Sequence, residues 1–265
     1  MRVRSMQFLT NMIFWRRNGN VHDRGDYLLV ETPSNPGYYW GNLLIFGRPP
    51  AEGDHLRWMR LFEREFKHRP EVRHVLFGWE SDDGDGEGLR PFFESGFELE
   101  MNVTLLAERV HPPPKVNEEI EVRRIETEAE WEAVLDNQVR CRRARFDLDA
   151  YTNFKRSAIE NWRKLIGDGL GDWYGAFLGD RLVADLGLFR EGDIARFQAV
   201  GTDPDFRRRG ICGTLVHCVS RHALERLHVK TLVMVADENY HAAKIYESVG
   251  FDPRERVAFL CRYPK

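Results

Sequence analysis

Starting at residue 200, the sequence reads Val200-Gly-Thr-Asp-Pro-Asp-Phe-Arg-Arg-Arg-Gly-Ile-Cys-Gly-Thr214. A strand-like run leads into this stretch, Asp203-Pro204 is typical of a turn, and an apolar stripe with helical spacing follows it. A helix that begins directly after three arginines and a glycine presents free backbone N–H groups, and the positive end of its dipole, to one point in space. Such a point favours an anion, and we interpret the stretch as a pyrophosphate site. Residues 203–213 are called the arginine loop below.

The composition is that of a globular protein with one large domain or two ordinary ones. Its 265 residues are 42% hydrophobic, which is enough for buried cores, and the net charge of −3 gives no general attraction to nucleic acid or to anionic membranes. The four cysteines are scattered without a CxxC pair, which argues against zinc and favours a reducing compartment. The apolar run at 6–15 is too short to span a bilayer and lacks a cleavage site. We therefore expect a cytoplasmic protein that uses no metal and binds neither nucleic acid nor membrane.

Hydrophobic periodicity and turn residues outline the secondary structure. In the first half they predict strands at 26–31, 38–46, 72–79 and 102–107, helices around 56–66 and 91–95, and an acidic, glycine-rich loop at 81–88. In the second half they predict strands at 120–125, 173–178, 182–189, 194–200, 231–236 and 257–261, and helices starting at Thr127 and spanning 151–165, 211–227 and 240–249. Thr127 and Glu130 form a capping box.

The sequence contains an internal repeat. Phe92-Phe-Glu-Ser-Gly-Phe97 resembles Ile245-Tyr-Glu-Ser-Val-Gly-Phe251, with one residue inserted in the second copy. Counted back from each Gly-Phe pair, both halves read strand, loop, helix, strand, helix, strand. The proline-rich segment 111–115 between them is typical of a stiff, solvated linker. Two copies of one fold is the simpler interpretation, and a chance likeness between short aromatic motifs is the alternative.

The two halves differ at the arginine loop. The first half has Arg48-Pro-Pro-Ala-Glu-Gly53 at the corresponding place. Proline has no backbone N–H group, so this loop lacks donors that the second half offers. We therefore expect a pyrophosphate to bind only to the second half.

Two motifs of the second half are similar to those of a known family. Arg207-Arg-Arg-Gly210-Ile-Cys212 resembles the Arg/Gln-x-x-Gly-x-Gly/Ala motif with which the GNAT N-acetyltransferases bind acetyl-CoA, although Cys212 replaces its second small residue. The family's signature Asn-x-x-Ala-x-x-x-Tyr-x-x-x-Gly-Phe has counterparts at Asn239, Ala242 or Ala243, Tyr246, Gly250 and Phe251. The resemblance covers about 118–265. It implies a mixed α/β fold with two tandem acetyltransferase-like domains, a degenerate one at 1–110 and an acetyl-CoA-binding one at 118–265.

The resemblance also implies how the donor is held. Backbone amides of 208–213, helped by the arginines, would bind the pyrophosphate, and 200–202 would pair with the pantetheine arm as an extra strand does. A break in the sheet after that strand would admit the cofactor. The implied cofactor-binding residues are Val200, Gly201, Thr202, Arg207, Arg208, Arg209, Gly210, Ile211, Cys212, Gly213, Thr214, Asn239 and Tyr246. Asn239 caps its helix or lies near the cofactor, and Tyr246 occupies the position of the family's general acid or is a core aromatic.

The implied reaction is direct attack of a primary amine, on a small molecule or on a protein or peptide, upon the thioester of acetyl-CoA. No general base is assigned, because the strand before the arginine loop offers no carboxylate. Asp147, Asp149 and Asp185 are weak candidates on the substrate side, and caps, turns or surface positions are their more ordinary roles. The cluster 140–145 is a solvent-facing helix end or a receptor for an acidic substrate. A non-catalytic acyl-CoA sensor and an acyltransferase with another donor stay open, as does the choice between monomer and homodimer.

Overall fold

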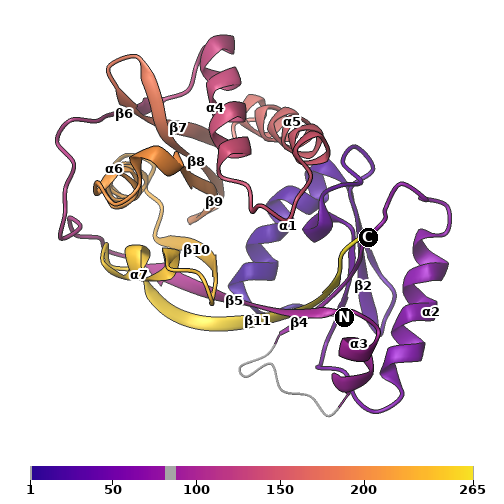
Figure 1. Cartoon of the computed structure of the whole chain (residues 1–265). Helices are drawn as coiled ribbons and strands as arrows, with labels where there is room; N and C mark the ends of the chain where they lie inside the picture. Colours follow the sequence, from indigo (N-terminus) through magenta and orange to yellow (C-terminus); the bar gives the residue numbers. More distant parts are fainter. Residues whose placement is uncertain (1, 81–87, 265) are drawn as a thin grey trace. The chain divides into compact units, whose positions relative to one another are not determined.

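The computed structural model describes residues 2–80 and 88–264 and divides into two compact units (Figure 1). Unit 1 comprises Met1–Thr104, Asp237–Asn239 and Glu255–Lys265. Unit 2 comprises Leu105–Ala236 and Tyr240–Arg254. Most of the acidic loop expected at 81–88 lies outside the described residues.

Unit 1 is a mixed sheet with helices. Its elements in chain order are α1 (Met6–Asn18), β1 (Asn20–Asp23), β2 (Tyr27–Glu31), the 3-10 helix η1 (Tyr39–Gly41), β3 (Leu43–Phe46), α2 (Asp54–Phe66), β4 (Val75–Glu80), α3 (Arg90–Glu94) and the first part of β5 (Glu98–Ala107). Strands β1, β2 and β3 are antiparallel neighbours, and β3 pairs with β4 in parallel. The core contains a dense group of aromatic rings, in which Trp58 of α2 stacks on Phe46 of β3 with centroids 3.8 Å apart.

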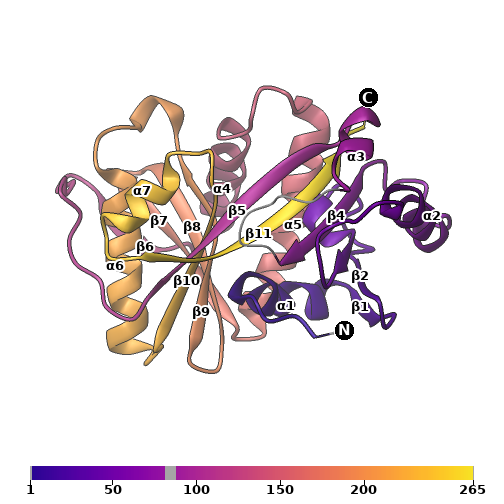
Figure 2. The same ribbon diagram turned by 90° about the horizontal axis from the view of Figure 1, so that it is seen from below.

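Unit 2 likewise combines mixed strand pairing with helices. Its elements are β6 (Glu121–Arg124), α4 (Glu128–Arg140), α5 (Leu148–Gly167), β7 (Gly171–Leu178), β8 (Arg181–Glu191), β9 (Ile194–Thr202), the 3-10 helix η2 (Pro204–Phe206), α6 (Ile211–Arg226), β10 (Thr231–Asp237), α7 (Ala242–Glu247) and the first part of β11 (Asp252–Arg262). Strands β6 to β9 are antiparallel neighbours, and β9 pairs with β10 in parallel. Helices α4 and α5 lie on one face of this sheet, whereas α6 and α7 lie on the other (Figures 1 and 2).

The elements from β1 to β5 and those from β7 to β11 follow one order. In each series three antiparallel strands precede a helix, a parallel strand, a short helix and a last strand, whereas β6, α4 and α5 of the second half have no counterpart in that series. The last strands are exchanged: β11 pairs with β4, with Val257 opposite Glu80, and β5 is the neighbour of β10. The compact units therefore do not follow one cut of the chain between 110 and 118, and the expected domains 1–110 and 118–265 stay a prediction.

Several element predictions need correction. The run at 6–15, for which no helix or strand is predicted above, forms α1, whose buried face includes Phe8, Met12 and Trp15. The strand expected at 38–46 is η1 followed by the short β3, and the helix expected at 240–249 is confined to α7. Leu56 falls at helical spacing with Phe62 and Phe66, which are buried, yet it is itself 63% exposed. None of the helices in the described ranges is both long and apolar enough to cross a membrane.

The loop before α2 in unit 1 is closed by a carboxylate of its own. Asp54 Oδ2 accepts hydrogen bonds from Arg48 Nη1 at 2.6 Å and from the backbone N–H of Ala51 at 2.9 Å. The Asp54 side chain is 6% exposed, and Arg57 is a further partner at 3.5 Å. The Asp54 carboxylate thus lies beside the N-terminus of α2, a place where a helix otherwise attracts an anion from solution. The two prolines remove backbone donors and Asp54 adds a negative charge, and both features disfavour an external anion at this loop.

Replacing Asp54 by asparagine should lower the free energy of unfolding by about 2 kcal/mol, because hydrogen bonds to a charged group are lost. Burial raises the pKa of Asp54, but the Arg48 guanidinium and the Ala51 N–H lower it further, so the net pKa lies below its usual value. The stabilisation is therefore complete above the ordinary carboxyl pKa and is lost as the pH falls through the lowered one. Urea unfolding of D54N and of the control D26N measures this. Asp26 is 74% exposed and pairs with the same Arg57, so its replacement should cost no more than about 0.5 kcal/mol. Equal losses in the two variants would contradict the role of Asp54.

Candidate cofactor site

The arginine loop turns the chain sharply between β9 and α6. Asp203 caps η2 by accepting a hydrogen bond from the backbone N–H of Asp205 at 3.0 Å. Arg208 and Gly210 then adopt positive φ angles of 62° and 80° before α6 begins at Ile211. Within the described part of the chain, no hydrogen bond reaches the backbone N–H groups of 208–213. A row of donors and the positive end of a helix dipole are thus available to an anion.

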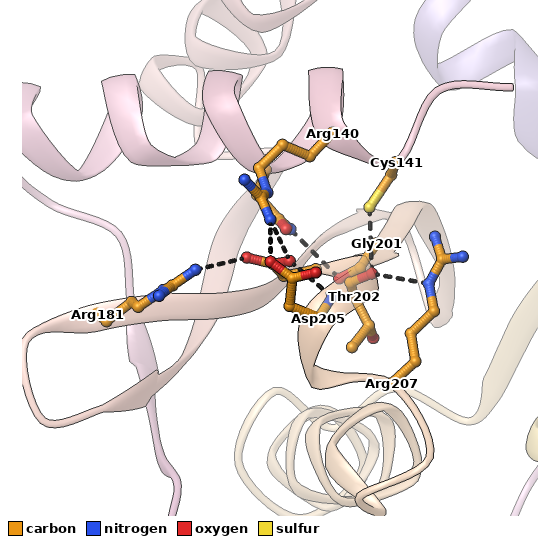
Figure 3. Close-up of polar contacts among 9 residues, drawn as sticks. Arg140, Cys141, Arg181, Gly201, Thr202, Asp205 and Arg207 are labelled. Carbon is orange, nitrogen blue, oxygen red and sulfur yellow. Dashed lines mark hydrogen bonds and ion pairs between the residues drawn. The ribbon is translucent and has the colours of Figure 1, made fainter. Parts of the chain in front are cut away.

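Asp203 anchors this turn through two arginines. Its carboxylate, only 4% exposed, accepts hydrogen bonds from Arg140 at 3.0 Å and from Arg181 at 3.1 Å. Arg140 also pairs with Asp205 at 2.6 Å (Figure 3). Burial raises the pKa of Asp203, but the Asp205 N–H and the two guanidinium groups lower it further, and the net shift is downward. Arg140, expected to face solvent or an acidic substrate, instead fixes the loop to the end of α4.

The segment at 111–115 is part of the site, which the expectation of a solvated linker missed. Pro113 is buried, and a Cβ atom built on Gly213 would lie 3.0 Å from the Pro113 side chain. A Cβ atom on Gly210 would lie 2.4 Å from the backbone oxygen of Lys115. Both glycines therefore permit this segment to approach the loop. The glycines were the only sequence signal of the contact.

Side chains that follow this segment bind the carbonyl groups of the loop. Lys115 Nζ donates to the Arg208 carbonyl at 3.0 Å, and Asn117 Nδ2 donates to the Arg209 carbonyl at 3.0 Å. The backbone N–H of Asn117 also donates to Thr214 Oγ1 at 2.9 Å. The loop carbonyls are thus engaged by the protein itself, while the amides of 208–213 stay available.

A pocket of about 1020 Å³ opens beside the arginine loop. Of the expected cofactor-binding residues, those that line it are Val200, Gly201, Thr202, Arg207, Arg208, Gly210, Ile211, Cys212, Gly213 and Tyr246. Those that do not line it are Arg209, Thr214 and Asn239. Lys115, Arg142, Arg143 and His241 line it in addition. The pocket is therefore basic where it meets the loop.

Strands β9 and β10 separate at this pocket. Their parallel pairing runs from Ile194 opposite Thr231 to Arg196 opposite Val233, although β9 continues to Thr202 and β10 to Asp237. Beyond Arg196, the β9 edge on this side is not paired with β10 among the described residues. An opening in the sheet thus exists at the place where the resemblance implies one.

Tyr246 and Cys212 meet the pocket with neutral side chains. Tyr246 is 5% exposed, and burial, followed by the nearby Cys212 and Tyr240, raises its pKa well above the ordinary value for tyrosine. Its phenol therefore stays protonated at neutral pH and is able to donate a proton or a hydrogen bond. Burial also raises the pKa of the Cys212 thiol to about 11, so this cysteine is a poor nucleophile.

The weaker candidates are spread over several places. Asn239 is exposed and does not cap α7, whose N-cap is His241 without a side-chain bond, so the capping interpretation was wrong. Asp147 caps α5 by accepting from the Ala150 N–H at 2.9 Å, and Asp149 is exposed in the first turn of that helix. Asp185 is neither a cap nor a surface residue, because it is fully buried inside unit 2. The described residues contain no group of three or more His, Cys, Asp or Glu side chains placed to hold a metal ion.

Comparison with known proteins gives a family match and several similar structures. Residues 174–260 match the family model described as FR47-like protein. Comparison with curated protein sequences gives no match. A functionally unknown conserved protein from Staphylococcus epidermidis has a TM-score of 0.74 at 14% identity, covering 94% of this chain and 96% of that one.

Two further structures carry a family description. A GCN5-related N-acetyltransferase from Kribbella flavida has a TM-score of 0.65 at 13% identity, covering 98% of this chain and 95% of that one. A tandem GNAT protein from the clavulanic acid biosynthesis pathway has a TM-score of 0.53 at 14% identity, covering 84% and 76%. The resemblance found in the motifs and the expected mixed α/β fold are thus confirmed. The chain has the fold of the GCN5-related N-acetyltransferases, and its second half matches the FR47-like family.

Proposed function

We propose that this protein is a cytoplasmic N-acetyltransferase that moves the acetyl group of acetyl-CoA to a primary amine. The observation that carries the proposal is the arginine loop, where the amides of 208–213 are available next to a basic pocket. That pocket continues along 200–202 of β9, beyond the residues that pair with β10, and to Tyr246. An acetyl donor with phosphate groups and an extended arm fits this arrangement, which offers backbone N–H groups to the phosphates, a strand edge to the arm and a phenol beyond it.

Each part of the site has a separate role in the proposed reaction. The amides and arginines of the loop would hold the pyrophosphate, and the backbone at 200–202 would align the pantetheine arm toward Tyr246. When bound, acetyl-CoA supplies an activated acyl group that an amine attacks directly. Tyr246 gives its proton to the departing sulfur, a role that suits a phenol kept neutral by burial.

The amine must lose a proton during the attack. Among the described residues that line the pocket there is no carboxylate. His241 also lines it, and histidine is the side chain that most often acts as a general base in enzymes. We propose His241, or water beside it, as the acceptor of that proton. The same lack of a carboxylate favours the second candidate function, an acyl-CoA-binding module without turnover.

Two measurements separate these functions. Calorimetry with acetyl-CoA, propionyl-CoA and free coenzyme A tests the donor site. Thiol release is then followed with a panel of small amines, amino acids, peptides with free N-termini and a lysine-rich protein. Binding with amine-dependent thiol release supports the transferase, and binding without release for every amine supports the non-catalytic module. Failure of all three coenzyme A compounds to bind would remove both functions.

A further inference from the structure

Strand β9 is irregular where it enters the pocket. Its register with β8 shifts between the pair Asp185–Gly201 and the pair Gly187–Gln198. Inside this irregularity Ala199 has a φ of 51°, a left-handed conformation that residues with a side chain rarely adopt. Such a conformation persists only where the surrounding structure fixes it.

Two side-chain amides from the end of α4 hold the irregular stretch. Gln138 Nε2 donates to the Ala199 carbonyl at 2.7 Å. Asn137 Nδ2 lies 3.5 Å from the Gly201 carbonyl. Each of the two amide residues is only 3% exposed. Since Gly201 and Val200 line the pocket, these amides set the backbone against which a ligand in the pocket lies.

A buried carboxylate fixes both amides. Asp185 Oδ1 accepts from Gln138 Nε2 at 2.7 Å and from Trp173 Nε1 at 3.0 Å, while Oδ2 accepts from Asn137 Nδ2 at 2.5 Å. Lys155 Nζ donates to Gln138 Oε1 at 2.8 Å. An ammonium group cannot accept a hydrogen bond, so it determines which end of the Gln138 amide faces Asp185 and Ala199.

The charges of this network are costly to bury. Asp185 has no exposed surface, and burial raises its pKa to about 6 although the three N–H donors and Lys155 oppose the shift. Burial lowers the pKa of Lys155 to about 8. Near neutral pH both groups are charged. Cys141 and Tyr151 are titratable groups beside them: the Tyr151 ring lies 5.6 Å from Lys155 Nζ, and Arg207 acts on Cys141. Asp185 and Lys155 are joined only through Gln138. Buried opposite charges stabilise a fold no better than apolar packing does, so stability alone does not explain their presence.

We propose that Asp185 and Lys155 are positioning residues for the donor: through Gln138 and Asn137 they hold the backbone of 199–201 in the conformation that aligns the acyl-pantetheine arm. Neither residue lines the pocket, so neither touches the donor. The inference rests on the proposed function and deepens it, because it separates the site into two parts. The arginine loop holds the phosphates, and the network sets the strand edge for the arm.

If the site has these two parts, replacing Asp185 or Lys155 should affect the binding of complete acetyl-CoA and of its phosphate fragment differently. D185N and K155M should weaken acetyl-CoA binding about tenfold or more, since a small displacement of a positioning backbone is costly. Binding of adenosine 3′-phosphate 5′-diphosphate, which has the pyrophosphate but lacks the arm, should change less than about twofold, because the loop is unaltered. The double variant D185N/K155M leaves no unpaired charge and should regain thermal stability over the single variants, while its acetyl-CoA affinity stays low.

Calorimetry of both ligands at a temperature where circular dichroism shows each variant folded gives these values. D172N is the matched control, because Asp172 is a partly exposed carboxylate on the neighbouring strand β7, paired with Arg124 at 3.3 Å. It should bind both ligands as the wild type does. Equal weakening of fragment and whole donor, or no weakening of either, would overturn the positioning role. Wild-type protein that binds neither ligand would instead remove the proposed function, and with it this inference.

Discussion

Replacing Gly210 by alanine is expected to weaken acetyl-CoA binding by about 100-fold, the scale of loss that follows a displacement of roughly 1 Å in a positioned group. Gly210 has a φ of 80°, and the new Cβ would lie 2.4 Å from the carbonyl oxygen of Lys115. That oxygen belongs to the backbone, so no side-chain rotation relieves the contact. Either the loop or the segment at 113–117 must therefore move. Because the two are in contact, the backbone amides of 208–213 are displaced in both cases.

Gly192→Ala is the matched control. Gly192 lies in the turn between β8 and β9 with a φ of 61°, and nothing lies within 4 Å of a Cβ built there. In both variants the new alanine must adopt a left-handed conformation, which costs about 1 kcal/mol, but only G210A adds the steric clash. Calorimetry with acetyl-CoA, at a temperature where both variants are folded, should therefore show a loss in G210A alone. Equal affinities in G210A and G192A would mean that the loop does not hold the donor.

The elements around this loop were predictable because their signals are local. The turn at Asp203-Pro204, the glycine at 210 and the stripe of α6 lie within one short stretch, and each acts on its own neighbours in the chain. The capping box of Thr127 and Glu130 is confirmed for the same reason. The internal repeat predicts two copies of one fold, and the elements from β1 to β5 do follow the same order as those from β7 to β11.

What the sequence could not reveal depends on partners far along the chain. Arg140 reaches Asp203 across 63 positions, and Lys115 reaches Arg208 across 93. The exchange of β5 and β11 leaves each half with its own regular pattern, so hydrophobic spacing contains no trace of it. Asp185 reads as an ordinary strand residue, because the amides and the lysine that allow its burial come from α4 and α5.

The final prediction concerns the proton given to the departing thiolate. Tyr246→Phe keeps a ring of the same shape in a site that is 5% exposed, and no hydrogen-bond partner of the Tyr246 hydroxyl is found among the described residues. Stability and acetyl-CoA affinity should therefore change little. Turnover with the best amine of the panel should fall by roughly 10²- to 10⁴-fold, the usual contribution of a positioned general acid.

Tyr240→Phe is the control, because Tyr240 lines the same pocket but is 42% exposed. This variant should retain most of the wild-type turnover. Because the pKa of Tyr246 lies well above its ordinary value, the wild-type rate should show no loss of this acid between neutral pH and the ordinary tyrosine pKa of about 10. Thiol release measured across that range tests both points, and unchanged turnover in Y246F would exclude the phenol as the acid and leave water in its place.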